Sequence, residues 1–366
     1  MEKEAHLYKK LKDPEGVAPR PYGAGKKVQC QNCAHYCVIL PGERGICGVR
    51  ENIKGKLYAL NYGKAIACHI DPIEKKPFFH FLPGSYSLSI ATVGCNFKCA
   101  NCQNWDISQM PQLTGRIEGE EISPKEIVEL ALKNNLPSIS YTYTEPAVFS
   151  EYALDTMKLA KKEGLKNNWV TNGFWSKELF DLISPYLDAA NVDLKGFTNE
   201  FYIKYCGGRL QPVLDTLKRL KDYNPPTASS RSLRSRAPKI WVEVTTLVIP
   251  TLNDDEKAFE NIAKFIKSEL GPETPWHITQ FSGAISWQLQ NLPDTPVETL
   301  EMAYKIGKEV GLKYVYTGNV PGLPSEDTFC PKCQTLVIDR TNYIIHRHDK
   351  QGKCPQCNEK LNLILE

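Results

Sequence analysis

Cysteine is the residue that most constrains this chain. There are 13 cysteines, an odd number, and eleven of them fall into three tight clusters. Residues 1–12 are charged and lack the apolar segment of an export signal, so we expect the thiols to lie in the reducing cytoplasm. In such a compartment clustered cysteines favour metal sites over disulfides. The clusters therefore predict metal centres.

The composition excludes several other classes of protein. With 42% hydrophobic and 24% charged residues, the chain is typical of a soluble globular protein rather than a disordered one. The 45 basic and 42 acidic residues leave a net charge of +3, which is too balanced to indicate binding to nucleic acid. No apolar stretch approaches the about 18 residues of a membrane span. We therefore expect no membrane partner and no nucleic acid partner.

The chain divides into three predicted parts. Residues 1–82 hold the first cysteine cluster among prolines and glycines, which predicts loops around a small metal site. Residues 83–323 alternate strand and helix patterns, and residues 324–366 carry the last cluster. Residues 224–238 are rich in Ser, Pro and Arg, which predicts a flexible insertion with little to bury; a basic patch for an acidic partner is the alternative.

The middle part has the pattern of an α/β fold. Short, mostly apolar stretches rich in β-branched and aromatic residues predict strands at Tyr86–Val93, Ser138–Tyr143, Asn168–Thr171, Ala190–Leu194, Ile240–Ile249, Trp276–Phe281 and Tyr314–Thr317. Between them, Ser123-Pro-Lys-Glu126 and Thr295-Pro-Val-Glu298 each predict a helix that begins with a capping box and an early proline. Repeated strand–helix units predict right-handed crossovers and a parallel sheet or barrel.

The central cysteine cluster follows the first strand of this part. Its pattern is Cys95-x3-Cys99-x2-Cys102. Three thiolates are one too few for a closed zinc site and one too few to saturate a [4Fe-4S] cluster, so one iron would stay open to a reacting ligand. The alternative is a structural metal site completed by a distant cysteine, Cys68 or Cys206. The place of the cluster at a strand end, where parallel barrels build active sites, favours the open cluster.

This cluster resembles the signature of the radical S-adenosylmethionine (SAM) superfamily. More closely, the chain is similar to the radical SAM enzyme of the AmmeMemoRadiSam system, a relative of the activases of pyruvate formate-lyase and other glycyl-radical enzymes. The resemblance is carried by GICGVREN (45–52), HIDPIEKKPFFHFLPGS (69–85), SIATVGCNFKCANCQNWDIS (89–108), YTYTEPAVF (141–149), VTNGF (170–174), NVDLKGF (191–197) and CGGRLQPVL (206–214). It implies a partial (β/α)6 TIM-like barrel whose [4Fe-4S] cluster binds SAM. One electron would then cleave SAM to methionine and a 5′-deoxyadenosyl radical, which removes a hydrogen atom from the substrate.

The resemblance also implies a set of SAM contacts, which are Asn101, Thr144, Glu145, Thr171, Asn172, Asp193, Lys195 and His277. Glu145 stands in the turn that takes the SAM amino group in related enzymes, with a solvated strand-end carboxylate as the alternative. Thr171 and Asn172 should lie near the SAM carboxylate. Asp193 and Lys195 alternate on one strand face, so both can point into the site, although an ordinary buried ion pair is the alternative.

Two predicted contacts concern the adenosine. His277 falls where activases place a histidine near the ribose, but a histidine in an apolar strand is often a satisfied core residue. Asn101 stands where the superfamily usually has an aromatic residue that packs on adenine, so Phe97 or Trp105 are alternatives for that contact. No residue beyond the cluster ligands is assigned to catalysis.

The C-terminal cysteine set predicts zinc. It consists of Cys330, Cys333, Cys354 and Cys357, with spacing C-x2-C-x20-C-x2-C. Four thiolates close a tetrahedron, so the metal would be structural. The β-type residues of 336–345 fit a zinc-ribbon-like module, and an iron–sulfur centre is the alternative.

The N-terminal cysteine set leaves its metal open. It consists of Cys30, Cys33, Cys37 and Cys47, with spacing C-x2-C-x3-C-x9-C. Four thiolates can hold either zinc or an auxiliary [4Fe-4S] cluster, and structural zinc is the preferred interpretation by a small margin.

Two functions remain from the sequence. The first is a radical SAM oxidoreductase of the activase type, with an electron donor of the flavodoxin or ferredoxin type. Its substrate is unidentified; a protein is one option, and Memo-like or AMMECR1-like proteins are expected partners from the family association. The second is a non-catalytic zinc-ribbon protein that binds nucleic acid or protein. The balanced charge and the open three-cysteine site favour the enzyme.

Overall fold

The computed structural model describes residues 2–11, 26–224, 239–320, 322–341 and 343–366. The predicted insertion at 224–238 therefore lies outside the described residues, apart from Asn224. In the part of the chain that is described, no helix combines the length and apolar character needed to cross a bilayer.

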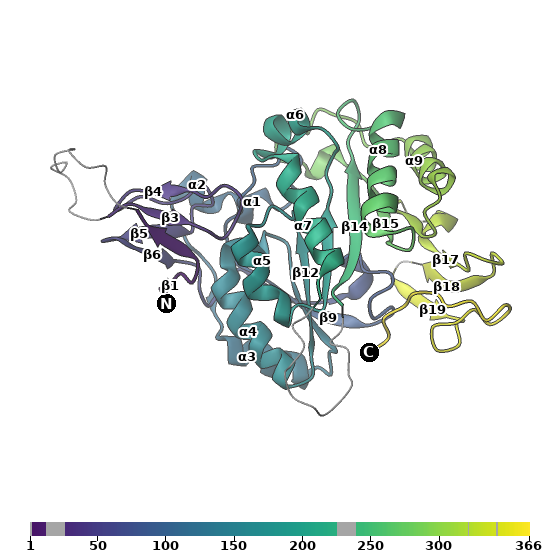
Figure 1. Cartoon of the computed structure of the whole chain (residues 1–366), viewed down its shortest axis with the longest axis horizontal. Coiled ribbons are helices and arrows are strands. Elements are labelled where there is room, and N and C mark those ends of the chain that lie inside the picture. The colour runs from purple at the N-terminus through teal and green to yellow at the C-terminus, as the bar shows by residue number, and fades with distance from the viewer. Residues whose placement is uncertain (1, 12–25, 225–238, 321, 342) are drawn as a thin grey trace.

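A mostly parallel eight-stranded sheet forms the centre of the molecule (Figure 1). Its strands, in spatial order, are β16 (Val315–Gly318), β15 (Trp276–Gln280), β14 (Trp241–Val248), β13 (Ala189–Asp193), β12 (Lys166–Thr171), β11 (Ser138–Tyr141), β9 (Tyr86–Ala91) and β8 (Ala67–Pro72). Every neighbouring pair is parallel except β8 with β9. The predicted α/β fold with a parallel sheet is thus confirmed, and each predicted strand is present within about two residues. The partial (β/α)6 barrel stays a prediction.

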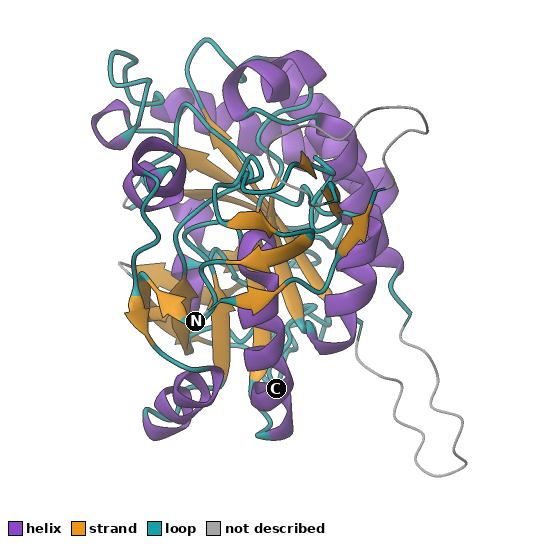
Figure 2. Ribbon diagram, turned by 90° about the vertical axis from the view of Figure 1, so that its left-hand side faces the viewer, coloured by secondary structure: helices purple, strands orange, loops and turns teal. Residues whose placement is uncertain are grey.

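Helices connect successive parallel strands and pack along the sheet (Figures 1 and 2). The longer ones are α3 (Pro124–Lys133), α4 (Ser150–Lys162), α5 (Lys177–Ile183), α7 (Leu210–Asp222), α8 (Glu256–Phe265) and α9 (Val297–Val310). Three short helices, α1 (Trp105–Ser108), α2 (Met110–Thr114) and α6 (Asn199–Phe201), lie in loops after strands. The strands of the central sheet therefore lie side by side in the order in which they occur along the chain.

One predicted helix start is confirmed and one is wrong. Ser123 and Glu126 form the reciprocal capping box of α3. Thr295 does not cap α9, because its buried hydroxyl donates to the carbonyl of Val248 at 2.6 Å and accepts from the amide of Phe281 at 3.0 Å. The Thr295 hydroxyl therefore bonds residues at the ends of two strands instead of capping the helix.

Small sheets flank the central sheet at opposite ends of the molecule (Figure 1). The N-terminal part forms the sheets β1-β6-β5 (Lys3–Glu4, Lys56–Ala59, Arg50–Ile53) and β2-β3-β4 (Tyr8–Lys10, Val28–Cys30, Val38–Ile39), and β7 (Lys64–Ala65) pairs with β10 (Glu120–Glu121). The C-terminal part forms the antiparallel sheet β17-β18-β19 (Thr328–Phe329, Leu336–Thr341, Ile344–Arg347). The predicted boundaries at 82 and 323 stay predictions.

The C-terminal part is tied to the segment that precedes β9. The amide of Leu82 donates to the carbonyl of Ile364, and the amide of Ile364 donates to the carbonyl of His80, both at 2.8 Å. The Arg340 guanidinium donates to the carbonyl of Phe79 at 2.9 Å and lies over the Phe79 ring. These contacts hold the C-terminal part against the segment that precedes β9.

Polar side chains form a ladder across the strands. The Ser140 hydroxyl lies 2.6 Å from that of Ser87 and donates to Asn168 at 2.7 Å. Thr245 donates to Asn191 at 2.8 Å two strands further along. These side chains are buried, and each bonds a partner on a neighbouring strand, as buried polar groups require. The expectation of nearly apolar strands therefore fails at these positions.

Candidate active site

The loop that carries the central cysteines follows β9 and is fixed from two sides. On one side, the amides of Lys98 and Ala100 donate to the carbonyls of Cys206 and Tyr205, both at 2.8 Å. On the other, the Gln109 side chain donates to the carbonyl of Phe97 at 3.0 Å. The loop is thus held by the turn after α6 and by the start of α2.

A cavity of about 400 Å³ lies at the carboxyl ends of the parallel strands. Nearly all of the predicted centre and its SAM contacts line this cavity: Cys95, Cys99, Asn101, Cys102, Thr144, Glu145, Thr171, Asn172, Asp193 and Lys195. These residues come from loops after four different strands, which is the usual construction of an active site in parallel α/β proteins. His277 is the one predicted SAM contact that does not line it.

The three central thiols line the wall of the cavity rather than surrounding one point. Among the described residues, only the C-terminal cysteine set brings three or more ligand atoms within 4.8 Å of one another. Single-ion spacing is therefore absent from Cys95, Cys99 and Cys102. A cluster places each thiolate on a different iron, so this donor set fits an iron–sulfur cluster with one open iron.

Cys206 lies beside this centre without lining the cavity. A hydrogen bond from the thiol of Cys206 lowers the pKa of Cys99 and outweighs the effect of burial. Cys206 is fully buried, and neither it nor Cys68 is among the described residues that line the cavity. The structure therefore places Cys206 as a neighbour of Cys99, outside the set of residues that line the cavity.

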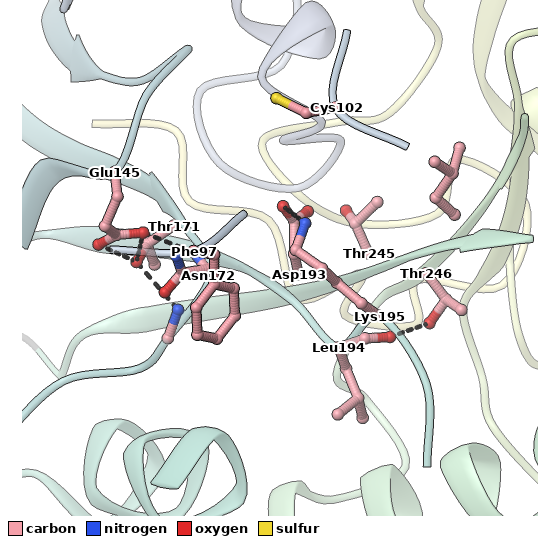
Figure 3. Close-up of polar contacts among 12 residues, drawn as sticks. Phe97, Cys102, Glu145, Thr171, Asn172, Asp193, Leu194, Lys195, Thr245 and Thr246 are labelled. Atoms are coloured by element: carbon pink, nitrogen blue, oxygen red, sulfur yellow. Dashed lines mark hydrogen bonds and ion pairs between the residues drawn. The ribbon is translucent and has the colours of Figure 1, made fainter. Parts of the chain in front are cut away.

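Glu145 is buried and has many donors (Figure 3). Its carboxylate accepts from the Thr171 hydroxyl at 2.8 Å and from the Asn172 amide at 2.8 Å. It also accepts from the Ala147 amide at 3.1 Å and from the Trp175 indole at 3.3 Å. Burial raises the pKa of Glu145, and these donors oppose that rise. Glu145 thus joins the ends of β11 and β12.

Asp193 and Lys195 both point toward the cavity from the end of β13, as their alternation predicts (Figure 3). Lys195 donates to Asp193 at 2.7 Å. Burial lowers the pKa of Lys195, but the charges of Asp193 and of the Cys99 thiolate outweigh it and raise the pKa. A charged ion pair therefore stands next to Cys99.

His277 belongs to a buried network beside a second cavity of about 190 Å³. Its Nε2 lies 2.7 Å from the Glu243 carboxylate, which also accepts from the amides of Phe79 and His80. Its ring stacks on Tyr316. His277 thus has the partners of a satisfied core histidine, and its role near a ribose stays a prediction.

The candidate adenine contacts differ in position. Asn101 and Phe97 line the main cavity, and Phe97 packs on Phe174 and Tyr202. Trp105 instead stacks on Trp287. Of the two aromatic alternatives, only Phe97 therefore lies on the cavity wall.

Sequence reasoning missed a buried lysine in the cavity wall. Lys76 is 2% exposed and donates to Asp71 at 2.7 Å, and its ammonium lies over the Tyr143 ring. The Tyr143 hydroxyl also donates to Asp71. Burial raises the pKa of Asp71, but the bonds from Lys76, Tyr143 and Lys75 lower it overall. The only signal was the Lys-Lys-Pro of segment 69–85.

The two flanking cysteine sets differ in their spacing. In the C-terminal set, Cys330 lies 3.5 Å from Cys357 and Cys333 lies 3.5 Å from Cys354, sulfur to sulfur. All four of these ligand atoms lie within 4.8 Å of one another, so they can surround one metal ion. The N-terminal set lines a separate small cavity.

The sequence and the structure were compared with known proteins. The sequence matches the family model of the radical SAM superfamily over residues 89–266. It is 43% identical to an uncharacterised protein of Methanocaldococcus jannaschii, over 99% of this chain and 100% of that protein. It is 23% identical to the (2S)-3-sulfopropanediol dehydratase activating enzyme of Klebsiella oxytoca, over 71% of this chain and 75% of that enzyme. Among solved structures, a domain of pyruvate-formate lyase-activating enzyme from Bacteroides vulgatus is 16% identical with a TM-score of 0.40, over 49% of this chain and 98% of that one.

Proposed function

We propose, from the premise that this chain belongs to the radical SAM superfamily and is related to glycyl-radical-enzyme activases, that it cleaves SAM reductively at a [4Fe-4S] cluster held by Cys95, Cys99 and Cys102. Such a cluster supplies the single electron that divides SAM into methionine and a 5′-deoxyadenosyl radical. The radical would remove a hydrogen atom from an unidentified substrate, for which a protein is one option.

The observation that carries the proposal is that three thiols, and no fourth, line one cavity among the described residues. The same cavity offers a carboxylate, an ammonium and amide groups to a zwitterionic ligand. Lys195 can donate to a carboxylate, and Asp193 can accept from an ammonium. Asn172, bonded to Asn96 at 2.7 Å, is oriented by the residue that follows Cys95.

Several finer assignments extend this proposal. We assign the chain to the AmmeMemoRadiSam type, with a partial (β/α)6 barrel and with Memo-like or AMMECR1-like proteins as partners. A flavodoxin- or ferredoxin-type protein would deliver the electron. The spacing of Cys330, Cys333, Cys354 and Cys357 supports structural zinc in a ribbon-like module, since a zinc ion with bonds of about 2.3 Å holds its sulfurs about 3.8 Å apart.

The test is anaerobic incubation of the full chain with SAM and a strong reductant, followed by measurement of 5′-deoxyadenosine. The wild-type chain should form this product, and Cys99→Ala should abolish it. Cys68→Ala is the matched control, because Cys68 belongs to no cysteine set and should leave the rate unchanged. If Cys99→Ala still forms 5′-deoxyadenosine at the wild-type rate, the cluster assignment is wrong.

A further inference from the structure

The second cavity, of about 190 Å³, adjoins the main one. The residues that line both are Lys75, Pro77, Thr279, Asn319 and Tyr343. Phe79, Val320 and Ile345 add apolar surface to the wall of the second cavity. Since a cavity of about 150 Å³ can hold one benzene ring, this space has room for a single ring or a group of similar size.

The wall of the second cavity offers little free charge to a ligand. Lys75 donates to Asp71 at 3.0 Å, and the terminal nitrogens of Arg340 donate to two carbonyls and a hydroxyl. Nε of Arg340 and Oε2 of Glu74 have no partner among the described residues, but both atoms are enclosed by the protein and out of reach of a ligand. Burial raises the pKa of Glu74 and of Glu326, which disfavours their charged forms. The wall therefore fits an uncharged group.

One ring nitrogen of His277 is open to this cavity. His277 is 2% exposed and lines the cavity. Its Nε2 bonds the Glu243 carboxylate, whereas its Nδ1 has no hydrogen-bond partner among the described residues. Nδ1 does not belong to the enclosed polar atoms that lack a partner, so the small exposed part of the ring includes it. Because the cavity is the space that His277 lines, Nδ1 faces into it.

Glu243 fixes which nitrogen of His277 carries the proton. The Glu243 carboxylate is buried and also accepts from the amides of Phe79 and His80. Burial raises its pKa, but the bond with His277 and the other donors lower it overall, so this carboxylate is charged and can only accept. Nε2 of His277 is therefore the donor, and Nδ1 of the neutral ring is an acceptor. Contacts with the rings of Tyr316 and Phe79 hold the imidazole in this orientation.

We propose that the second cavity binds a ring-sized, uncharged group that carries an O–H or N–H donor, and that Nδ1 of His277 accepts from this donor. The group belongs to the substrate and lies next to the SAM cavity, an identification that rests on the proposed function. His277 thus serves the substrate and not the ribose of SAM.

The test measures the affinities of phenol and benzene for the full chain by saturation-transfer nuclear magnetic resonance. Phenol presents an O–H donor, and benzene has the same ring without it. The ratio of phenol affinity to benzene affinity should fall about fivefold in His277→Phe, as expected for the loss of one neutral hydrogen bond. This variant should still bind benzene, which shows that its cavity is intact. His348→Phe, at an exposed histidine that lines neither cavity, is the matched control and should keep the wild-type ratio.

Two further measurements do not depend on replacing His277. Ile345→Trp adds bulk to the wall and should weaken the binding of both probes. Saturating SAM should leave the affinity for phenol unchanged in the anaerobically reconstituted chain, because the two ligands occupy different cavities. Circular dichroism of each variant controls for folding.

Four outcomes would overturn the inference: no binding of either probe to the wild type, an unchanged ratio in His277→Phe, unchanged binding in Ile345→Trp, or displacement of phenol by SAM. The last outcome would place His277 in the SAM site. The titrations contain no reductant, so a chain that fails to cleave SAM can still bind phenol, and the two proposals fail separately.

Discussion

The substitution Gly208→Ala tests how the cysteine loop is positioned. A Cβ atom at Gly208 would lie 2.2 Å from Cε1 and 2.6 Å from Cζ of Phe97. Carbon atoms in contact lie about 3.5–4.0 Å apart, so the Phe97 ring would have to move by more than about 1 Å. It has little room, because it is 1% exposed and packs between Phe174 and Tyr202.

The cost follows from this overlap. Overpacking of a core typically costs about 1–3 kcal/mol, which lowers the ratio of folded to unfolded chain by roughly 5- to 150-fold. In a chain of this size the unfolding temperature should fall by roughly 1–4 °C. Because Phe97 lies between Cys95 and Cys99, the displaced ring should also move the two thiols and reduce the iron bound after anaerobic reconstitution.

The assay compares unfolding temperature, iron per chain and 5′-deoxyadenosine formation. Gly164→Ala is the matched control: its Cβ meets no atom within 4 Å, but its φ of +80° imposes backbone strain far from the site, so it should lose stability and keep its iron. Phe97→Leu should relieve the overlap, so that the double variant is more stable than the sum of the single effects. Wild-type stability and iron in Gly208→Ala, or strict additivity, would refute the reasoning.

Three further predictions concern ionisable groups. Glu151→Ala should lower the free energy of unfolding by about 3–5 kcal/mol, because it leaves the buried Arg50 unpaired. Asp181→Ala, which breaks the exposed pair with Lys177, should lower it by less than about 1 kcal/mol, and equal losses in denaturant titrations would contradict this. Burial lowers the pKa of His80 from 6.5 to about 4. As the pH falls, the unfolded chain therefore binds a proton at this histidine before the folded chain does. The stability that neutral His80 contributes should be present above pH 6.5 and lost as the pH falls toward 4. The unfolding temperature should then fall less between pH 7 and pH 5 in His80→Asn than in the wild type, and identical falls would count against this role. Lys195→Met should weaken SAM binding by about tenfold, as expected for the loss of a hydrogen bond from a charged group, and should leave the amount of bound iron unchanged. Lys177→Met, on the surface, should bind SAM with wild-type affinity. Isothermal titration calorimetry measures both affinities, and an unchanged affinity in Lys195→Met would exclude the contact.

The parallel sheet was predictable because its strands are short apolar stretches separated by helix-like patterns. The capping box of Ser123 and Glu126 was also predictable, since it depends only on two residues three positions apart. Thr295 has the same local pattern, but the predicted cap was wrong because the Thr295 hydroxyl bonds Val248 and Phe281. Local patterns thus predict a cap only where no distant partner competes for the side chain.

The residues of the candidate site were predictable where they belong to recognisable sequence segments. They were less predictable where their position depends on contacts between residues far apart in the sequence. Lys76 was missed because its partner Asp71 lies in β8. The sequence of this strand, ACHIDP, has no strand pattern, and the strand forms by pairing with β9. The contact of Cys206 with Cys99 joins residues more than a hundred positions apart, and no spacing rule reports it. The N-terminal strands have only two to four residues, too few for a periodic signal.

The C-terminal sheet supplies part of the wall around both large cavities, since Tyr343 lines each of them and Ile345 lines the smaller one. During synthesis on the ribosome, the seven parallel strands emerge before these two residues. If the nascent chain folds in that order, this side of both cavities is completed last. A chain that stops after the final parallel strand would therefore lack Tyr343 and Ile345, and both cavities would be wider on this side.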